Sequence, residues 1–262
     1  VSIQMPVDAD ASTLYWSNAI GSGIDSGSTG CPLLVDGVLI VCAGDMICRV
    51  DPVSGEILAE GKPLSGYSRR ELARKIAYIP QSHTPAFDHT VLDSVLMGMT
   101  AQLGVFEQPG GLQREKAMQM LRALGLEKLA DRGCMKISGG ERQLMLLARA
   151  LVQDASMLIM DEPTANLDYG NSCRVMERVQ QLGRQGYTII FSTHDPNQAF
   201  SYATKVLALK DGGVMASGAP RDVLTEAVLS QLYGIPVARC EVQTKLGTKT
   251  ICMPMPGGEE DN

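Results

Sequence analysis

The chain has 262 residues, of which 45% are hydrophobic and 20% are charged. This balance is that of an ordinary globular protein, and it excludes a wholly disordered or fibrous chain. The formal net charge of −6 disfavours a general nucleic-acid-binding protein, so we expect no nucleic-acid partner.

The distribution of apolar residues and of cysteines indicates where in the cell the protein works. No stretch reaches the roughly 18 uncharged apolar residues that a membrane-spanning helix needs. The seven cysteines include no CxxC pair, which predicts packed, reduced thiols and neither a zinc site nor a disulfide framework. We therefore expect a protein of the reducing cell interior, built as one large α/β domain or two small ones.

The first sixty residues differ from the rest in charge and in pattern. Residues 1–61 hold one basic residue, Arg49, against eight acidic residues. Two apolar runs flank Asp36-Gly37, which is a strong hairpin signal, and residues 46–60 repeat the strand–turn–strand pattern. After a Gly/Ser-rich loop at 19–30, we therefore predict a β meander for this β-rich segment, residues 1–60.

From Lys62 onward, helical and strand patterns alternate, which predicts a layered α/β domain with parallel strands. The short apolar run 76–79 ends at Pro80 and is followed by Gln81. Ligands in open α/β sheets lie beyond the carboxyl ends of strands, so Gln81 is placed to contact one. A solvated turn residue is the alternative.

A glycine-containing turn precedes the next helical pattern. Ser138 and two glycines lead into residues 141–151, where apolar side chains recur on one helical face. Ser138 can cap this helix, and the glycines let a ligand approach the backbone closely. The helix start then offers unpaired N–H groups and the positive end of the helix dipole to a phosphate. An ordinary capped helix is the alternative.

Two adjacent carboxylates follow a continuous apolar run. Residues 156–160 have the pattern of a strand buried on both faces, and Asp161 and Glu162 come directly after it. One carboxylate can hold Mg²⁺ through water while the other orients or deprotonates an attacking water. Helix capping or ion pairing is the alternative, although two such carboxylates repel each other without a cation or hydrogen-bond donors.

The last third of the chain contains further strand patterns. A buried strand predicted at 188–191 ends in a polar segment with His194, which can donate a hydrogen bond to a phosphate oxygen or a catalytic water. A structural histidine is the alternative. Residues 207–218 predict a hairpin, residues 240–253 predict another strand pair, and residues 257–262 predict a frayed acidic tail.

The order of these segments resembles the ATP-binding subunits of ABC transporters over residues 62–235. The matching segments are the signature motif at 138–143, the Walker B segment at 161–164, the D-loop at 166–168, the Q-loop glutamine Gln81 and the switch histidine His194. The resemblance implies an α/β fold with a P-loop-NTPase-like core sheet, a helical subdomain and an N-terminal β meander. It implies ATP and Mg²⁺ as cofactors.

The resemblance also implies a role for each matching residue. Glu162 would polarise the hydrolytic water, and His194 would sense the γ-phosphate, so these two would be catalytic. Asp161 and Gln81 would bind the metal. The residues that contact the nucleotide would be Gln81, Ser138, Gly139, Gly140, Glu141 and Asp168. Ser138 and Gly140 would contact ATP held by the opposite subunit of a head-to-tail dimer.

Domain limits and partners follow from the same resemblance. Residues 61–81 and 151–239 would form the ATPase core, residues 82–150 the helical signature subdomain and residues 240–262 a C-terminal extension. The segments around Gln81 and His194 most resemble importers of the iron–siderophore, haem, cobalamin or molybdate type. The partners would then be transmembrane permease subunits and a second ATP-binding subunit. The chain would lie peripherally on the cytoplasmic face of the cell membrane.

The sequence departs from the family at the phosphate-binding loop. The pattern GxxxxGK followed by Ser or Thr does not occur, and its expected window, residues 33–41, is apolar. The glycine-rich stretch 21–29 also lacks lysine, and Tyr15 and Trp16 are the aromatic candidates for stacking on adenine. A non-hydrolysing, truncated or chimeric nucleotide-binding module is therefore the alternative to an active ATPase.

Residues 31–58 instead resemble one blade of a PQQ-type β-propeller. One blade cannot close a propeller, because such repeats bury their faces on their neighbours. Two interpretations follow. The chain joins a propeller fragment to a transporter ATPase without its usual first strands, or it begins with a divergent meander of the ABC family.

Overall fold

The computed structural model describes residues 33–35, 38–43, 46–50, 57–59, 62–81, 87–103, 107–211, 213–245 and 247–255. Before residue 62 it describes the backbone only. The predicted loop at 19–30, the glycine-rich stretch 21–29, the aromatic candidates Tyr15 and Trp16 and the predicted tail at 257–262 lie outside the described residues. The chain divides into two compact units, residues 65–192 and residues 1–64 with 193–262.

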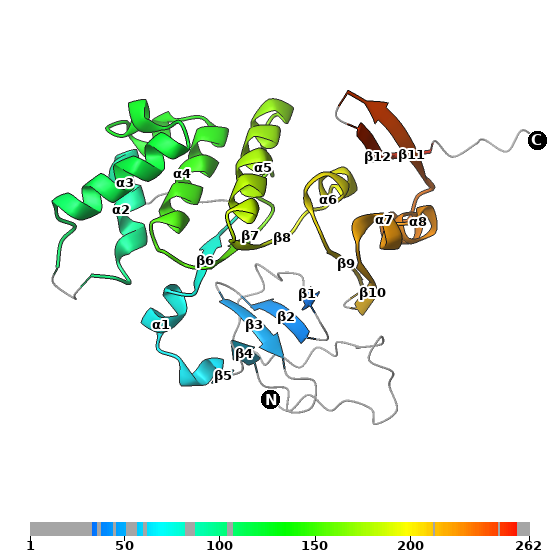
Figure 1. Cartoon of the computed structure of the whole chain (residues 1–262), viewed down its shortest axis with the longest axis horizontal. Coiled ribbons are helices and arrows are strands. Elements are labelled where there is room, and N and C mark those ends of the chain that lie inside the picture. Colours follow the sequence, from blue (N-terminus) through cyan, green and yellow to red (C-terminus); the bar gives the residue numbers. More distant parts are fainter. Residues whose placement is uncertain are drawn as a thin grey trace, which may run out of the picture. The chain divides into compact units, whose positions relative to one another are not determined.

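The amino-terminal strands form an antiparallel meander, as predicted. They are β1 (Leu33–Val35), β2 (Val38–Ala43), β3 (Met46–Val50), β4 (Ile57–Ala59) and β5 (Lys62–Pro63), and they follow one another across a single sheet (Figure 1). Val35 pairs with Val38, so the first two strands are joined by a two-residue connection, as predicted. The register of β1 and β2 is therefore the one that a two-residue hairpin requires.

The unit of residues 65–192 is built on a parallel sheet in the order β6-β7-β8. These strands are β6 (Ile76–Ile79), β7 (Met157–Met160) and β8 (Thr188–Phe191). Ile79 pairs with Met160, which pairs with Phe191, so the three strands end together at one edge. The last three residues of the central strand β7 are buried, as its continuous apolar run predicts.

Helices cover this sheet, and α2, α3 and α4 gather in the cyan and green part of Figure 1. The helices are α1 (Arg69–Ala73), α2 (Val91–Leu96), α3 (Gly111–Ala123), α4 (Gly139–Leu151) and α5 (Tyr169–Arg184). Short 3-10 turns are η1 (Leu64–Gly66), η2 (Met97–Met99), η3 (Glu127–Leu129) and η4 (Cys134–Lys136). The core contains fully buried side chains from several of these elements, among them Val91, Val95, Leu121, Met145, Leu147 and Leu158.

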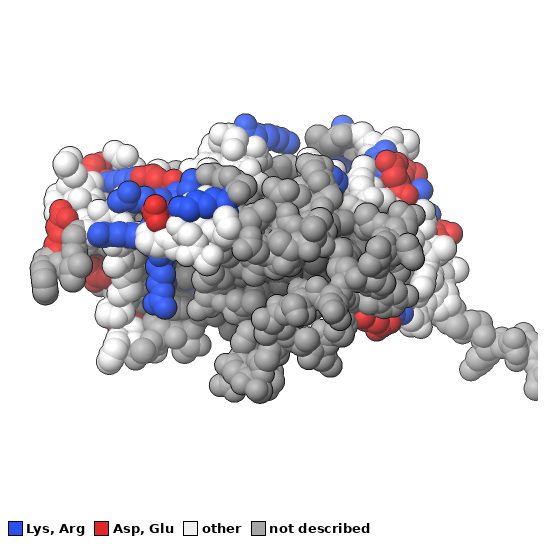
Figure 2. All heavy atoms as spheres, turned by 90° about the horizontal axis from the view of Figure 1, so that it is seen from below, with Lys and Arg blue, Asp and Glu red and all other residues white. Residues whose placement is uncertain are grey.

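The described surface carries charges of both signs. Arg69, Arg70 and Glu71 of α1 are all exposed, and Arg70 Nε donates to the carbonyl oxygen of Ala101 at 3.0 Å. Figure 2 shows Lys and Arg side chains gathered on the left of the view, with Asp and Glu side chains among them.

The described residues from 193 onward contain two hairpins and three helices. The elements are α6 (Pro196–Tyr202), β9 (Val206–Lys210), β10 (Gly213–Gly218), α7 (Pro220–Val223), α8 (Glu226–Tyr233), β11 (Val237–Thr244) and β12 (Gly247–Pro254). Both predicted hairpins are confirmed, and the second begins three residues earlier than expected. Ala199, Leu229, Val237 and Cys252 belong to one small apolar core, so α6, α8 and the last hairpin pack together. Across the described part of the chain, no helix is long and apolar enough to cross a bilayer.

A close approach of η2 to α4 gives a test of the helical packing. A Cβ on Gly98 would overlap the carbonyl oxygen of Arg149 and lie 2.8 Å from Val152 Cγ2. Because that oxygen belongs to the backbone of α4, the Gly98→Ala variant must displace a helix. We expect its free energy of unfolding to fall by about 1–3 kcal/mol in urea titrations. Gly111→Ala is the control, since its Cβ would meet nothing within 4 Å. Equal losses in the two variants would contradict this packing.

Candidate functional site

Four polar residues follow the three parallel strands at their common edge: Gln81 after β6, Asp161 and Glu162 after β7, and Ser192 after β8. The sheet pairing continues at this edge. The N–H of Asp161 donates to the Ile79 carbonyl at 2.9 Å, and the N–H of Ser192 donates to the Met160 carbonyl at 3.0 Å. The backbone that carries Asp161 and Ser192 is therefore fixed by the sheet itself.

The Ser192 hydroxyl joins both residues that follow β7. It donates to Asp161 Oδ1 at 2.7 Å and accepts from the Glu162 N–H at 2.8 Å. All three residues are partly buried, so these hydrogen bonds are partly shielded from water. The sequence analysis did not identify Ser192. The available signal was its position directly after a predicted strand, the same position that Asp161 has after β7.

Glu162 is held by a different donor. Gln81 Nε2 donates to Glu162 Oε2 at 2.8 Å. The backbone of Glu162 has φ +39°, a value that residues other than glycine rarely adopt. Strained backbone of this kind concentrates at functional sites, where surrounding contacts maintain it. Each of the two adjacent carboxylates therefore has its own hydrogen-bond donor, which eases the repulsion expected between them.

The donor set at this edge can be compared with what Mg²⁺ requires. Among the described residues, no group of three or more His, Cys, Asp and Glu side chains could hold a metal ion. Mg²⁺ usually keeps several waters and takes one or two carboxylates together with phosphate oxygens. Asp161 accepts the Ser192 hydrogen bond with Oδ1, so its Oδ2 can face a cation. Gln81 donates to Glu162 with Nε2, so its Oε1 can do the same. The residues fit Mg²⁺ bound together with a phosphate.

The turn before α4 has the capped geometry that the sequence predicts. Ser138 Oγ accepts from the Glu141 N–H at 3.3 Å, and the Ser138 N–H donates to Glu141 Oε2 at 2.7 Å. This reciprocal pair is a capping box. The hydrogen bonds from the Ser138 backbone and hydroxyl lower the pKa of Glu141. Ser138 and Gly139 are exposed, so the start of α4 is open to contact from outside.

The two glycines of this turn pack against the segment that opens α5. A Cβ on Gly140 would lie 2.7 Å from Asn171 Cγ, and one on Gly139 would lie 3.2 Å from Leu167 Cδ2. From the sequence, the glycines are expected to let a ligand approach the backbone closely. In the structure they also admit the 166–171 segment, so the signature turn and the D-loop segment form one packed edge.

Asp168 caps α5. Its Oδ1 accepts from the Asn171 N–H at 2.8 Å, and its Oδ2 accepts from Asn171 Nδ2 at 2.6 Å. These hydrogen bonds, the backbone one first, lower the pKa of Asp168. The carboxylate thus favours its ionised form at the exposed start of α5, where it holds the Asn171 side chain that packs against Gly140.

His194 belongs to the other compact unit. It is exposed, in the loop between β8 and α6. Its carbonyl oxygen accepts from the Tyr233 hydroxyl at 3.0 Å. Of the predicted site residues, the structure brings Gln81, Asp161 and Glu162 together at the sheet edge. It also brings Gly139 and Gly140 together with the 166–171 segment, which contains Asp168.

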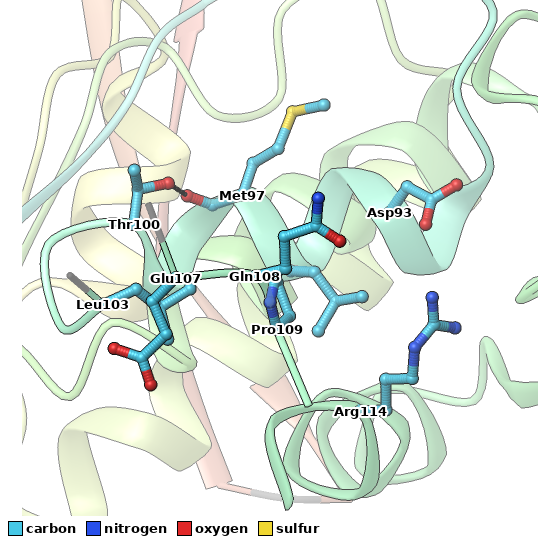
Figure 3. Close-up of a pocket in the computed structure, with 9 residues that line it drawn as sticks. Asp93, Met97, Thr100, Leu103, Glu107, Gln108, Pro109 and Arg114 are labelled. Carbon is cyan, nitrogen blue, oxygen red and sulfur yellow. Dashed lines mark hydrogen bonds between the residues drawn. The ribbon is translucent and has the colours of Figure 1, made fainter. Parts of the chain in front are cut away.

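The helical part of the 65–192 unit contains a hollow of about 290 Å³ (Figure 3). Apolar and charged side chains line it together, and Figure 3 shows Arg114 extending from α3 beside it. The lining residues are Asp93, Leu96, Met97, Thr100, Leu103, Glu107, Gln108, Pro109 and Arg114. None of the predicted site residues is among them, so the hollow is a feature separate from the sheet edge.

Comparison with known proteins identifies relatives of the chain. The sequence model of the ABC transporter family matches residues 45–165. An uncharacterised ABC transporter ATP-binding protein of Haemophilus influenzae is 42% identical over 182 residues, which are 70% of this chain and 69% of the relative. The ferric enterobactin transport ATP-binding protein FepC of Escherichia coli is 32% identical over 192 residues, 73% of this chain and 70% of that protein.

The solved structures lead to the same family. An inward-facing ABC transporter, described as being of the metal-chelate type, matches with a TM-score of 0.70 and 33% identity over 79% of this chain and 77% of its own. The P-loop-NTPase-like fold is thereby confirmed. The propeller interpretation of residues 31–58 gains no support, since the family match begins within that stretch. With its ordered motifs, its carboxylates at the edge of a parallel sheet and these relatives, the chain belongs to the ATP-binding proteins of ABC transporters.

Proposed function

We propose that the chain couples ATP hydrolysis to the uptake of a metal chelate, of the iron–siderophore, haem, cobalamin or molybdate type. The observation that carries the ATPase part is the hydrogen-bonded sheet edge, where Ser192 holds Asp161 and Gln81 holds Glu162. The cargo class is supported by the ferric enterobactin relative and by the metal-chelate type transporter. The cargo itself would be selected by the membrane and binding-protein partners.

The residues at the sheet edge divide the chemistry between them. Asp161 and Gln81 would hold Mg²⁺, which neutralises charge on the β- and γ-phosphates when it is bound. Glu162 orients the attacking water and accepts its proton, and the hydrogen bond from Gln81 fixes the direction of its carboxylate. His194 donates a hydrogen bond to the γ-phosphate.

The exposed turn before α4 serves a second ATP-binding subunit. Ser138 caps a helix of 13 residues that begins with Gly139, Gly140 and Glu141. The capping box uses the N–H groups of Ser138 and Glu141, so the N–H groups of the two glycines and the helix dipole would attract phosphate. In a head-to-tail dimer these groups contact ATP held by the partner. Asp168 lies beside the same turn and would contact that nucleotide site too. The packing of Gly140 against Asn171 supports this proposal, because it presents both segments as one edge.

The hollow in the helical part suits contact with a permease subunit. It combines apolar Leu96, Met97 and Leu103 with charged Glu107 and Arg114 (Figure 3). Met97 is 41% exposed, which is high for a large apolar side chain. A segment of a transmembrane partner bound here would place the chain peripherally on the cytoplasmic face of the membrane.

The first prediction concerns hydrolysis. The Glu162→Gln variant keeps the shape of the side chain but removes the base, so Mg²⁺-dependent phosphate release should fall about 100-fold or more. Mg-ATP should still raise its unfolding temperature. Glu177→Gln, on the exposed side of α5, is the control and should leave both measurements unchanged. A wild-type protein that shows neither Mg-ATP stabilisation nor phosphate release would favour the non-hydrolysing module.

The second prediction concerns the metal. Ser192→Ala leaves Asp161 Oδ1 without its hydroxyl donor and the Glu162 N–H without its acceptor. Residues that orient a metal ligand typically contribute 10–100-fold to metal affinity. The Mg²⁺ concentration at half-maximal ATP hydrolysis should therefore rise about tenfold. Ser172→Ala on α5 is the matched control. The same Mg²⁺ dependence in both variants would contradict the role of Ser192.

The third prediction concerns the permease. Met97→Glu places a charge on the proposed contact surface, and we expect uptake by the reconstituted transporter to fall about tenfold. ATP binding by the isolated chain should not change. Met255→Glu, at a similarly exposed methionine near the carboxyl terminus, should leave uptake intact. Normal uptake by the Met97 variant would show that the permease binds elsewhere.

A further inference from the structure

The loop that carries His194 is tied to the C-terminal segment. Tyr233 is the last residue of α8, and its hydroxyl donates to the His194 carbonyl oxygen at 3.0 Å. Gly234 follows with φ +72°, a left-handed conformation that ends the helix and leads the chain toward β11. The position of Tyr233 is thus set by the helix that immediately precedes the last hairpin.

The Tyr233 hydroxyl remains a donor at neutral pH. Burial raises the pKa of Tyr233 to about 12, and the nearby Cys252 thiol and Asp195 carboxylate act in the same direction. The hydroxyl therefore keeps the proton that it donates to the His194 carbonyl oxygen.

A second connection joins the loop to the last strand. Asn197 Oδ1 accepts from the Cys252 N–H at 2.8 Å, and Asn197 Nδ2 donates to the Cys252 carbonyl at 3.2 Å. Asn197 stands in the first turn of α6, and its own N–H donates to Asp195 Oδ1 at 2.9 Å. Its side-chain amide therefore pairs with the edge of β12 much as another strand would.

The residues on either side of His194 are also fixed. Thr193 Oγ1 accepts from the Asp195 N–H at 3.1 Å and donates to Gln198 Oε1 at 3.1 Å. Beneath this loop, Ala199 of α6 shares one apolar core with Leu229 and Cys252. The backbone of the His194 loop is thus held from α6, α8 and β12 together.

We propose that Tyr233 is a positioning residue for His194, and that the C-terminal segment from α8 to β12 is thereby a working part of the ATPase. From the sequence, residues 240–262 are expected to be only a C-terminal extension. This proposal rests on the proposed function, since it assigns a purpose to the position of the switch histidine. The Tyr233 hydroxyl donates to the backbone carbonyl of His194, so in this proposal it acts through His194.

The first test needs no nucleotide. The chain has three histidines, His83, His89 and His194, so its imidazole C–H signals can be followed individually by NMR, with the His194→Gln variant as assignment. Tyr233→Phe removes one hydroxyl and keeps the ring. We expect the His194 signal to shift or broaden while the His89 signal, from the other unit, stays in place. Tyr187→Phe is the matched control, since Tyr187 lies just before β8 in that other unit.

The second test measures steady-state ATP hydrolysis. A single hydrogen bond contributes on the order of 1 kcal/mol, which corresponds to about a fivefold change in rate. Tyr233→Phe should therefore lower kcat about fivefold and leave the KM for ATP unchanged, because the residue positions a group used in the reaction. The Tyr187→Phe variant should keep the wild-type kcat. A wild-type protein without ATPase activity would refute the proposed function, and the NMR result would still test the contact.

A second variant tests the connection to β12. Asn197→Asp keeps the size of the side chain but replaces the Nδ2 donor by an oxygen that faces the Cys252 carbonyl. Hydrogen exchange of the Cys252 amide and of the 193–198 backbone should become about tenfold faster. An active ATPase whose Tyr233→Phe variant keeps both its His194 signal and its kcat would overturn the proposal.

Discussion

The parallel pairing of three strands around β7 determines where the polar groups of this protein meet. Ile79, Met160 and Phe191 are neighbours in one register, so the residues after them emerge at one edge. The donors for the carboxylates come from the flanking strands, Gln81 from one side and Ser192 from the other. A shift of one residue in the pairing of β6 with β7 would take the Gln81 donor from Glu162, and the same shift between β7 and β8 would take the Ser192 donor from Asp161.

The same residues serve packing and the proposed chemistry. Gly140 admits Asn171 to the start of α4, and Asp168 uses its carboxylate to cap α5. The Ser138 capping box satisfies N–H groups at the start of α4 while the serine stays exposed. An exposed surface built from caps and close-packed glycines is rigid, which suits contact with a nucleotide held by another subunit.

The sequence allowed the elements with strong patterns to be predicted: the two-residue hairpin, the buried strand before Asp161, and the capped helix after Ser138. It did not reveal the hydroxyl of Ser192, because that contact depends on how β7 and β8 are aligned. The positive φ of Glu162 and the pairing of Asn197 with Cys252, 55 positions away, depend on tertiary structure in the same way. Gln143 shows the limit of periodicity, since it is polar and yet only 7% exposed.

The contact between Asn197 and β12 is made chiefly by the peptide group of residue 252, and the Cys252 thiol adds a longer hydrogen bond to Asn197 Oδ1 at 3.6 Å. What the site requires at 252 is a small side chain that fits the apolar core, because the cysteine is 8% exposed. Alanine or serine at 252 would keep the amide pairing. At 197, only a carboxamide side chain can both accept from the N–H of residue 252 and donate to its carbonyl oxygen. Cysteine-depleted versions of the protein for spectroscopic labelling can therefore be made at 252 without detaching the last hairpin from α6.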